Sequence, residues 1–296
     1  MVTPEPTLLL PNAWRDRAAS HGHRVDVLLA AHLGRARRRE QHPVEDFLFT
    51  YYSLRPAQLR RWHPGAGIAL VGAGERATWR DHREVGTDAG TAVTLDVRAL
   101  LARRGSAVRG VRELLVATAS RPAHLGCFGL HEWAMVYRQP PDAVRHAAWP
   151  LRLGPAGTDA VVEAHRMRCT HYDAYRFFTP EAAPRNGLRP SREATVALEQ
   201  PGCLHATMDL YKWAYKLLPA VPSELVVDAF ELARDVRELD MRASPYDLSG
   251  LGYEPVRIET PAGKAAYVAA QRAFARRGSR LRSLLLEALA RLDGHV

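Results

Sequence analysis

The sequence predicts a mainly α-helical protein, a multi-helical single domain with a small β-hairpin element. Two observations favour this fold class: several long stretches place apolar residues at helical spacing, and one short region reads as strands around glycines. Of the 296 residues, 47% are apolar, which is the share of a chain with a substantial core. Charge divides the chain into a basic N-terminal segment (about 1–62), a neutral middle (about 63–259) and a basic C-terminal helix (about 260–296), which we expect to form one domain.

The N-terminal third contains two predicted helices and the hairpin. Residues 12–39 carry an apolar stripe that includes Val25 and Leu29 and ends in a basic run. A second helix follows Pro43, a residue suited to a first turn, and is interrupted before Pro56. The stretches "GIALVGAG" and "RATWR" then read as two strands joined by a glycine turn.

The remainder is predicted to be helices joined by Pro- and Gly-rich connections at 140–160 and 179–191. The predicted helices are 94–104, 107–121, 204–218, 223–244 and 262–293. We expect Gly105 to separate the first two and Gly278 to break the last. Ser223 is a suitable N-cap for the helix that stops before Pro245.

Composition indicates a cytoplasmic protein with no membrane segment. No apolar run approaches the 18 or so residues that cross a bilayer, and the N-terminus lacks the pattern of a signal peptide. The chain has three cysteines, Cys127, Cys169 and Cys203, without CxxC spacing. This pattern predicts neither a disulfide framework nor a four-thiolate zinc site.

The net charge of +9 is concentrated at the two ends of the sequence. Residues 1–62 hold ten arginines and six acidic residues, and residues 260–296 hold seven basic and two acidic residues. Basic clusters of this kind are typical of proteins that bind nucleic acid, so DNA is the expected partner. The alternatives are solvated faces of terminal helices, or a nucleic-acid-binding protein without catalytic activity. No protein partner can be inferred.

One helical face of the stretch "CLHATMDLYKWAYK" carries His205, Asp209, Lys212 and Lys216 at four-residue intervals. The chain contains only three lysines, so two of them in one stripe suggest that a compact amine is required there. Ordinary i,i+4 pairs on a surface helix are the alternative.

A second stripe, which is acidic, lies on the predicted helix 223–244 and holds Asp228, Glu231, Asp235 and Glu238. Such a stripe is most often a solvated face. If it faced inward, it would need cationic partners or a metal ion.

The neutral middle also concentrates histidines and carboxylates, including His131 beside Glu132. This middle segment has no HExxH, HxH or Glu-x-x-His spacing, so it favours no metal site, and we expect no cofactor. If a metal ion is bound, the expected ligands are Glu132, Glu163, His165, His171 and His205. A metal-dependent oxidase or hydrolase in a helical bundle is therefore the alternative function.

Five stretches resemble a family of actinobacterial proteins usually labelled 3-methyladenine DNA glycosylase. They are "HPVEDFLFTYYSLRPAQLRRWHPG", "FGLHEWAMVYR", "LGPAGTDAVVEAHRMRCTHYDAYRFFTP", "QPGCLHATMDLYKWAYKLLP" and "ELARDVRELDMRASPYDLSGLGYEPVRIET". The resemblance covers nearly the whole chain. The sequence lacks the helix-hairpin-helix motif of the large helical glycosylase superfamily.

The resemblance implies hydrolysis of the N-glycosidic bond of alkylated purines, such as 3-methyladenine, in DNA. Excision of a flipped base needs a carboxylate near the sugar and aromatic rings around a cationic base. The catalytic residues implied in this way are Asp209, Asp173, Lys212 and Glu132. The substrate-binding residues implied are Tyr172, Tyr175, Phe177, Tyr211, Trp213, Trp133, His205 and Lys216.

Overall fold

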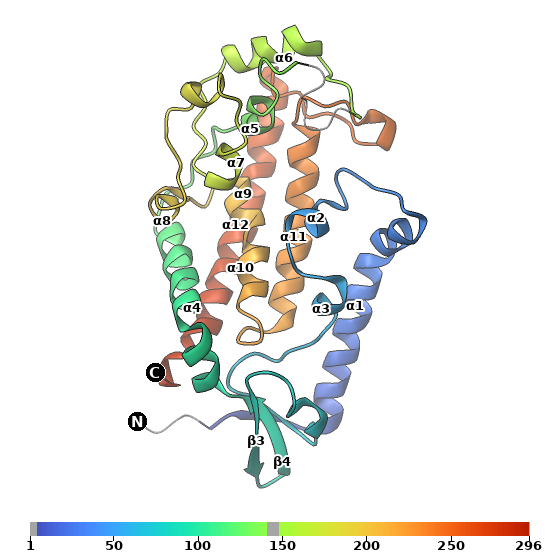
Figure 1. Ribbon diagram of the computed structural model, residues 1–296, viewed down its shortest axis with the longest axis vertical. Coiled ribbons are helices and arrows are strands. Elements are labelled where there is room, and N and C mark those ends of the chain that lie inside the picture. Colours follow the sequence, from blue (N-terminus) through green and yellow to red (C-terminus); the bar gives the residue numbers. More distant parts are fainter. Residues whose placement is uncertain (1–4, 141–147, 296) are drawn as a thin grey trace. The chain divides into compact units, whose positions relative to one another are not determined.

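The computed structural model describes residues 5–140 and 148–295 and is mainly helical, which confirms that part of the fold prediction (Figure 1). Its contacts divide the chain, expected to be one domain, into two compact units. The first unit consists of Met1–Leu115, Leu210–Glu231 and Arg280–Val296, and the second of Val116–Asp209 and Leu232–Ser279. The unit boundaries therefore do not follow the charge boundaries of the sequence.

The first unit combines a small sheet with helices. Its strands are β1 (Thr7–Leu9), β2 (Ile68–Val71), β3 (His82–Thr87) and β4 (Gly90–Leu95). Its helices are α1 (Pro11–Arg38), α2 (Phe47–Tyr51), α3 (Pro56–Leu59), α10 (Leu210–Lys216), and parts of α4 (Val97–Ala119), α11 (Ser223–Arg242) and α12 (Pro261–Ala290).

The sheet has four strands in the order β1-β2-β4-β3, and β3 and β4 form its hairpin (Figure 1). Strand β2 pairs in parallel with β1 and antiparallel with β4. The predicted hairpin over 67–80 is therefore wrong. After Val71 the chain turns at Gly72, whose φ is +65°, and enters a 3₁₀ turn, Gly74–Arg76. Because this turn buries Arg76, the stretch "RATWR" does not form a strand.

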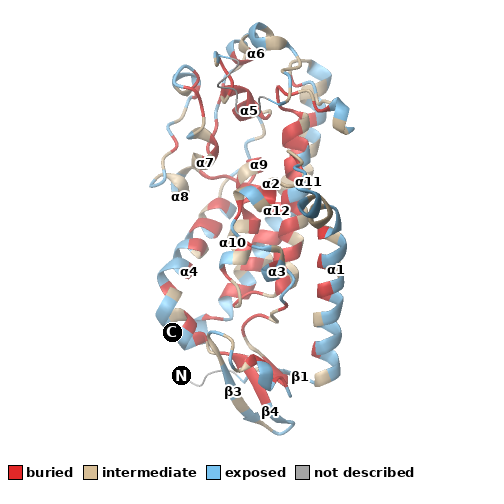
Figure 2. Ribbon diagram, turned by 45° about the vertical axis from the view of Figure 1, so that its right-hand side comes forward, coloured by how far each residue is buried: buried red, intermediate tan, exposed pale blue. Residues whose placement is uncertain are grey.

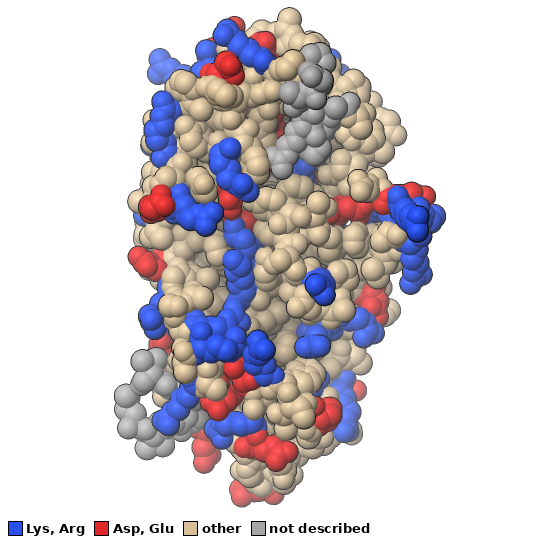
Figure 3. Space-filling view, viewed as in Figure 1, with Lys and Arg blue, Asp and Glu red and all other residues tan. Residues whose placement is uncertain are grey.

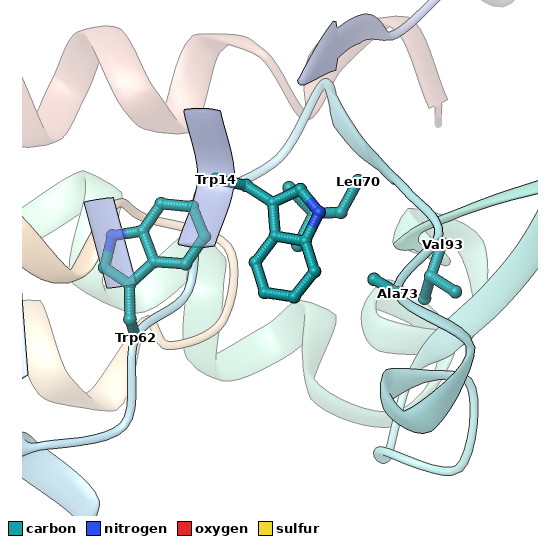
Figure 4. Close-up of a cluster of buried hydrophobic side chains, with 5 residues drawn as sticks. All are labelled: Trp14, Trp62, Leu70, Ala73 and Val93. Carbon is teal, nitrogen blue, oxygen red and sulfur yellow. The ribbon is translucent and has the colours of Figure 1, made fainter. Parts of the chain in front are cut away.

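A tryptophan cluster joins α1 to the sheet. Trp14, Trp62, Leu70, Ala73 and Val93 form a buried apolar group (Figure 4). The indole N–H of Trp14 donates to the carbonyl oxygen of Val71 at 3.0 Å, which satisfies the polar atom of a buried ring.

Helix α1 confirms the helix predicted over 12–39, and it starts at Pro11, a favourable first residue. Its buried positions lie along one side, and its outer side is exposed (Figure 2). The last turn contacts Asp46, which accepts hydrogen bonds from His32 Nδ1 at 2.9 Å and from Arg35 Nη2 at 2.6 Å. Asp46 therefore holds the segment after α1 against the helix.

Basic side chains near the N-terminus are largely matched by acidic ones. Arg38 pairs with Glu40 at 2.8 Å and Arg60 pairs with Asp26 at 2.7 Å. On the face drawn in Figure 3, acidic side chains lie among the basic ones. These pairs reduce the positive charge that this segment offers to a polyanion.

The acidic stripe of α11 is also paired with arginines. Within the first unit, Arg24 contacts Asp228 at 2.7 Å and Glu231 at 2.6 Å. Within the second, Arg277 contacts Asp235 at 2.8 Å, and Glu238 pairs with Arg242 at 3.1 Å. This stripe therefore forms partly exposed ion pairs.

The second unit is built from short helices around parts of α11 and α12. These helices are α5 (Leu130–Ala134), α6 (Gly154–Glu163), α7 (Tyr172–Tyr175), α8 (Thr195–Leu198) and α9 (Leu204–Met208). No helix in the described ranges is long and apolar enough to span a bilayer.

Four predicted helix boundaries are wrong. Helix α4 starts at Val97, after Asp96, whose carboxylate accepts from the N–H of Ala99 at 3.0 Å. Gly105 lies inside α4 and Gly278 lies inside α12. A glycine costs a helix only about 1 kcal/mol, which is small beside the apolar packing of a long helix. The stretch 204–218, predicted as one helix, is divided at Asp209 into α9 and α10.

We predict that Asp46→Asn lowers the free energy of unfolding by about 1–3 kcal/mol at pH 7, because it removes charge-assisted bonds from His32 and Arg35. Burial raises the pKa of Asp46, but the Arg35 and His32 bonds outweigh burial and lower this pKa to about 2. Its stabilisation is therefore complete above about pH 4 and is lost as the pH falls through about 2.

Urea unfolding between pH 2 and pH 7 measures this effect. The difference between wild type and Asp46→Asn should shrink toward the acidic limit. A difference that stays constant across this range would contradict the role given to the carboxylate.

Candidate metal centre

Four acidic residues are buried in the interior of the second unit. Glu132, Glu199, Asp209 and Asp240 are exposed by 5% or less, and within 5–140 and 148–295 no other acidic residue is buried to this degree. Burying a carboxylate is unfavourable unless it is paired, hydrogen-bonded or bound to a metal ion. The surroundings of these four groups therefore identify the candidate site.

The first ligand group consists of His131, His205 and Asp240, from α5, α9 and α11. One ligand atom of each lies within 4.8 Å of the others. His131 Nε2 is 2.9 Å from Asp240 Oδ1, yet neither atom makes an aligned hydrogen bond. Two ligands of one metal ion, each about 2.0–2.2 Å from it, are separated by a similar distance. The group has the composition of a site with two histidines and one carboxylate.

The second ligand group consists of His171, Glu199 and Asp209, and all three are buried. His171 Nε2 lies 3.2 Å from Asp209 Oδ2 and 3.5 Å from Glu199 Oε1. Each residue sits at a helix end: His171 precedes α7, Glu199 follows α8 and Asp209 follows α9. The helix ends therefore bring together residues from three separate parts of the sequence.

The two ligand groups are adjacent through His205. Its ring centroid is 4.3 Å from that of His131 and 5.2 Å from that of His171, on which it stacks. The site therefore holds three histidines and three carboxylates in one continuous buried cluster.

Arg237 connects Glu132, the fourth buried carboxylate, to this cluster. Its Nη1 is 3.0 Å from Glu132 Oε1 and 3.4 Å from Asp240 Oδ2. Among the described residues of the second unit, Arg237 is the one lysine or arginine exposed by 5% or less. Four carboxylates and one arginine are therefore buried in or beside this cluster, and metal ions are one kind of cation that stabilises buried carboxylates.

Electrostatics in the first ligand group favours an ionised Asp240 and a neutral His205, whereas it favours the protonated form of His131, whose proton a metal ion would displace. Burial opposes ionisation of Asp240, but His131 and Arg237 outweigh it and lower the pKa of Asp240. Burial, reinforced by His131, holds the pKa of His205 well below its usual value. Burial alone would lower the pKa of His131, but Asp240 raises it. Ionised carboxylate and neutral imidazole are the forms that bind metal ions.

A cavity of about 300 Å³ borders the first ligand group. His131 and His205 form part of its wall, together with Leu130, Met167 and Phe178. His205 is partly exposed, while Asp240 is buried behind it. A small molecule in the cavity would therefore meet the imidazoles directly.

The three cysteines also line this cavity, and burial raises the pKa of each thiol. The pKa of Cys169 rises to about 12. A thiol that stays protonated is neither a nucleophile nor a metal ligand. The chemistry of this site is thus assigned to histidines and carboxylates.

Polar contacts fix the start of α9, which carries His205. Gln271 Nε2 donates to the carbonyl oxygen of Gly202 at 2.6 Å, and Gln200 Oε1 accepts from the N–H of Gly202 at 2.7 Å. A Cβ atom on Gly202 would lie 2.5 Å from the carbonyl oxygen of His124, so only glycine fits there.

The residues implied by the glycosylase resemblance are divided between the two units. Asp209, Glu132, Trp133 and His205 belong to the second unit, where Trp133 is fully buried and donates to the carbonyl oxygen of Ala243 at 2.9 Å. Tyr211, Lys212, Trp213 and Lys216 belong to the first unit.

In the first unit, both lysines of the stripe contact one ring. Lys212 Nζ lies 4.5 Å and Lys216 Nζ 5.5 Å from the centroid of Trp213. Tyr211 is fully buried and packs on Tyr215 and Phe230. Because α9 ends at Met208 and α10 starts at Leu210, the two lysines do not lie on one helix with His205.

Apart from His171, the predicted residues of the segment 163–177 lie outside the two ligand groups. Asp173 pairs with Arg176 at 3.1 Å, and Arg176 covers the ring of Phe177 at 4.1 Å. Tyr172 begins α7, and Tyr175 packs on Phe178 at 5.1 Å.

Two of the expected metal ligands also have other partners. Glu163 accepts hydrogen bonds from Tyr137 and Arg138, both at 2.8 Å. His165 Nδ1 lies 2.6 Å from the carbonyl oxygen of Val161. Of the expected metal ligands, His205 belongs to the first ligand group and His171 to the second. Glu132 is linked to Asp240 of the first group through Arg237, which contacts both carboxylates.

Sequence reasoning missed Glu199 and Asp240 and gave His131 no specific role. Asp240 and Arg237 lie among apolar residues of α11, and a charged pair three positions apart within an apolar face is a detectable signal. Glu199 lies between α8 and a Pro-Gly turn, where the sequence gives no such signal.

Comparisons with known proteins do not identify the chain. No protein-family model matches it, and neither a curated protein nor a solved structure matches it. The function must therefore be argued from the site.

We predict that Glu132→Gln lowers the free energy of unfolding by about 3 kcal/mol, because it removes one partner of a buried ion pair. The matched control is Glu238→Gln, which breaks the half-exposed pair with Arg242 and should change stability by less than about 1 kcal/mol. Denaturant unfolding of both variants measures the difference. An equal loss of stability in the two variants would contradict a stabilising buried ion pair between Glu132 and Arg237.

Proposed function

We propose that this protein is a metal-dependent oxidase that uses non-haem iron. The observation that carries the proposal is the buried group of His131, His205 and Asp240 beside a cavity. Two histidines and one carboxylate with open coordination positions are the usual ligand set of non-haem iron enzymes that use dioxygen. Bound iron would supply the redox chemistry, and the protein supplies the ligands and the enclosure.

The second ligand group supports a dinuclear centre. His171, Glu199 and Asp209 offer one imidazole and two carboxylates next to His205. Carboxylate-rich pairs of metal ions in helical proteins use glutamate and histidine from several helices in this way. Two divalent ions would also stabilise the ionised forms of the buried carboxylates.

The residues around the cavity would then have distinct roles. His131 and His205, which line the cavity, and Asp240, which does not, would hold one metal ion. Leu130, Met167 and Phe178 give the cavity wall an apolar part that suits a small organic substrate, and Arg166, Arg168 and Gln200 give it a polar part. Arg237 orients Asp240 through its second oxygen.

Base excision remains the expectation that follows from the resemblance. It assigns Asp209 the role of catalytic carboxylate, whereas the proposal made here assigns Asp209 the role of metal ligand. The two assignments differ in what Asp209→Asn changes: base release in the first, metal content in the second. Asp235→Asn, at the partly exposed ion pair with Arg277, is the matched control for both.

We predict about two iron atoms per chain in untagged protein that is purified from iron-replete cells. Asp240→Asn should lower this content by about one, because it removes a negatively charged ligand. Asp235→Asn is the control on the same helix, and since it breaks only a surface pair with Arg277 it should leave the metal content unchanged. Elemental analysis of folded fractions gives the result.

The outcome that would contradict the proposal is wild-type protein that stays folded without stoichiometric metal and takes up none when iron(II) is added anaerobically. Release of bases from methylated duplex DNA, measured on the same samples, tests the glycosylase expectation. Base release by metal-free protein would favour that expectation.

We also predict that removing the metal ions with a chelator lowers the melting temperature by at least about 5 °C, because the buried carboxylates lose their cations. Restoring iron(II) should reverse the shift. Asp240→Asn should show a smaller shift than wild type. If the wild-type melting temperature stayed the same after the metal had been removed, the claim that the ions stabilise the fold would be contradicted.

A further inference from the structure

A groove of about 440 Å³ lies within the first unit, separate from the residues of the candidate metal centre. Its walls come from four segments: the region around α3, the turn before β3, the middle of α4 and the chain after α10. Its size fits a small molecule comparable to a mononucleotide.

The groove is strongly basic. Arg61, Arg80, Arg103, Arg104 and Lys216 line it, together with a single carboxylate, Asp81. Elsewhere in the first unit, some arginines pair with carboxylates, among them Arg35 and Arg60. The groove therefore has an excess of positive charge that an anion would neutralise.

Two of the arginines are held in place before any ligand arrives. Arg103 Nε donates to Asp81 at 3.3 Å, and the side chain of Asp81 is only 7% exposed. Arg104 donates to the carbonyl oxygen of Leu218 at 3.0 Å and to that of Lys216. Burial, together with the neighbouring Arg103, lowers the pKa of Arg104, so an anion nearby would relieve an unfavourable environment.

The other three cations are exposed and available. Among the described residues, no carboxylate lies within ion-pair distance of Arg61, Arg80 or Lys216. Arg61 lies over the ring of Trp79 at 5.2 Å, which leaves its guanidinium edges open. Guanidinium groups bind phosphate through paired hydrogen bonds, and lysine adds a point charge.

Neutral rings complete the wall. Trp79 lies edge-on to His63 at 5.3 Å and to His82 at 5.7 Å. Burial lowers the pKa of His63 to about 3, so this imidazole is neutral at physiological pH and can donate or accept a hydrogen bond. Tyr215 adds an aromatic face at the opposite segment.

We propose that this groove binds the phosphate group of a small phosphorylated ligand of mononucleotide size. The excess of four positive charges suits a doubly charged phosphate better than a single carboxylate. The volume of the groove, about 440 Å³, suits a ligand of mononucleotide size. This site and the proposed metal centre stand or fall independently, because they use different residues.

Isothermal titration calorimetry of the full chain tests the proposal with inorganic pyrophosphate, with AMP and with a short single-stranded oligonucleotide. Pyrophosphate and AMP should bind with one site per chain, and binding should weaken as salt is raised. The double variant Arg80→Gln/Lys216→Gln should weaken both by about tenfold or more, since each loses a charge-assisted contact. Both positions are exposed, so folding should be unaffected.

The control is Arg109→Gln, which removes an exposed arginine of α4 outside the groove and should leave both affinities unchanged. Three results would overturn the proposal. The first is that neither pyrophosphate nor AMP binds at millimolar concentration. The second is that Arg109→Gln weakens both affinities as much as the double variant does. The third is that the oligonucleotide binds and the two small ligands do not.

Discussion

The interior of the second unit depends on one electrostatic constraint, the burial of four carboxylates with a single buried arginine. Protonation would relieve it, but Asp240 has a lowered pKa and stays ionised. Asp240 outweighs burial and raises the pKa of His131, so a protonated His131 can compensate Asp240 in the absence of a metal ion, whereas burial and the neighbouring His131 hold His205 neutral. Metal ions would satisfy the same groups without protonation, and the 2.9 Å distance between His131 Nε2 and Asp240 Oδ1 is also compatible with two ligands of one ion.

This constraint also explains why the second unit consists of short helices. The second ligand group takes its residues from the ends of α7, α8 and α9, where the chain changes direction. Such positions can point three side chains from distant parts of the sequence at one place, which the faces of long helices do less readily. The first ligand group instead uses residues on or within α5, α9 and α11. Long helices thus provide rigid supports, and helix ends complete the site.

The sequence predicted the helical class and the long helices α1 and α12, since their apolar stripes extend over many turns. It did not predict the sheet correctly, because Arg76 is buried in a turn that looks like a strand. Within the site, His171, His205 and Glu132 could be selected by residue type alone. Glu199 and Asp240 could not be joined to them, because their proximity depends on tertiary contacts and not on a fixed spacing.

The cavity beside His131 and His205 is where a small molecule could approach a metal ion held by these ligands. The most direct test is anomalous X-ray diffraction at the iron edge, from crystals of protein purified with its metal. The account predicts an anomalous peak bounded by His131, His205 and Asp240, with a second peak beside His171, Glu199 and Asp209. No anomalous peak at either position, with His131 hydrogen-bonded directly to Asp240, would contradict it.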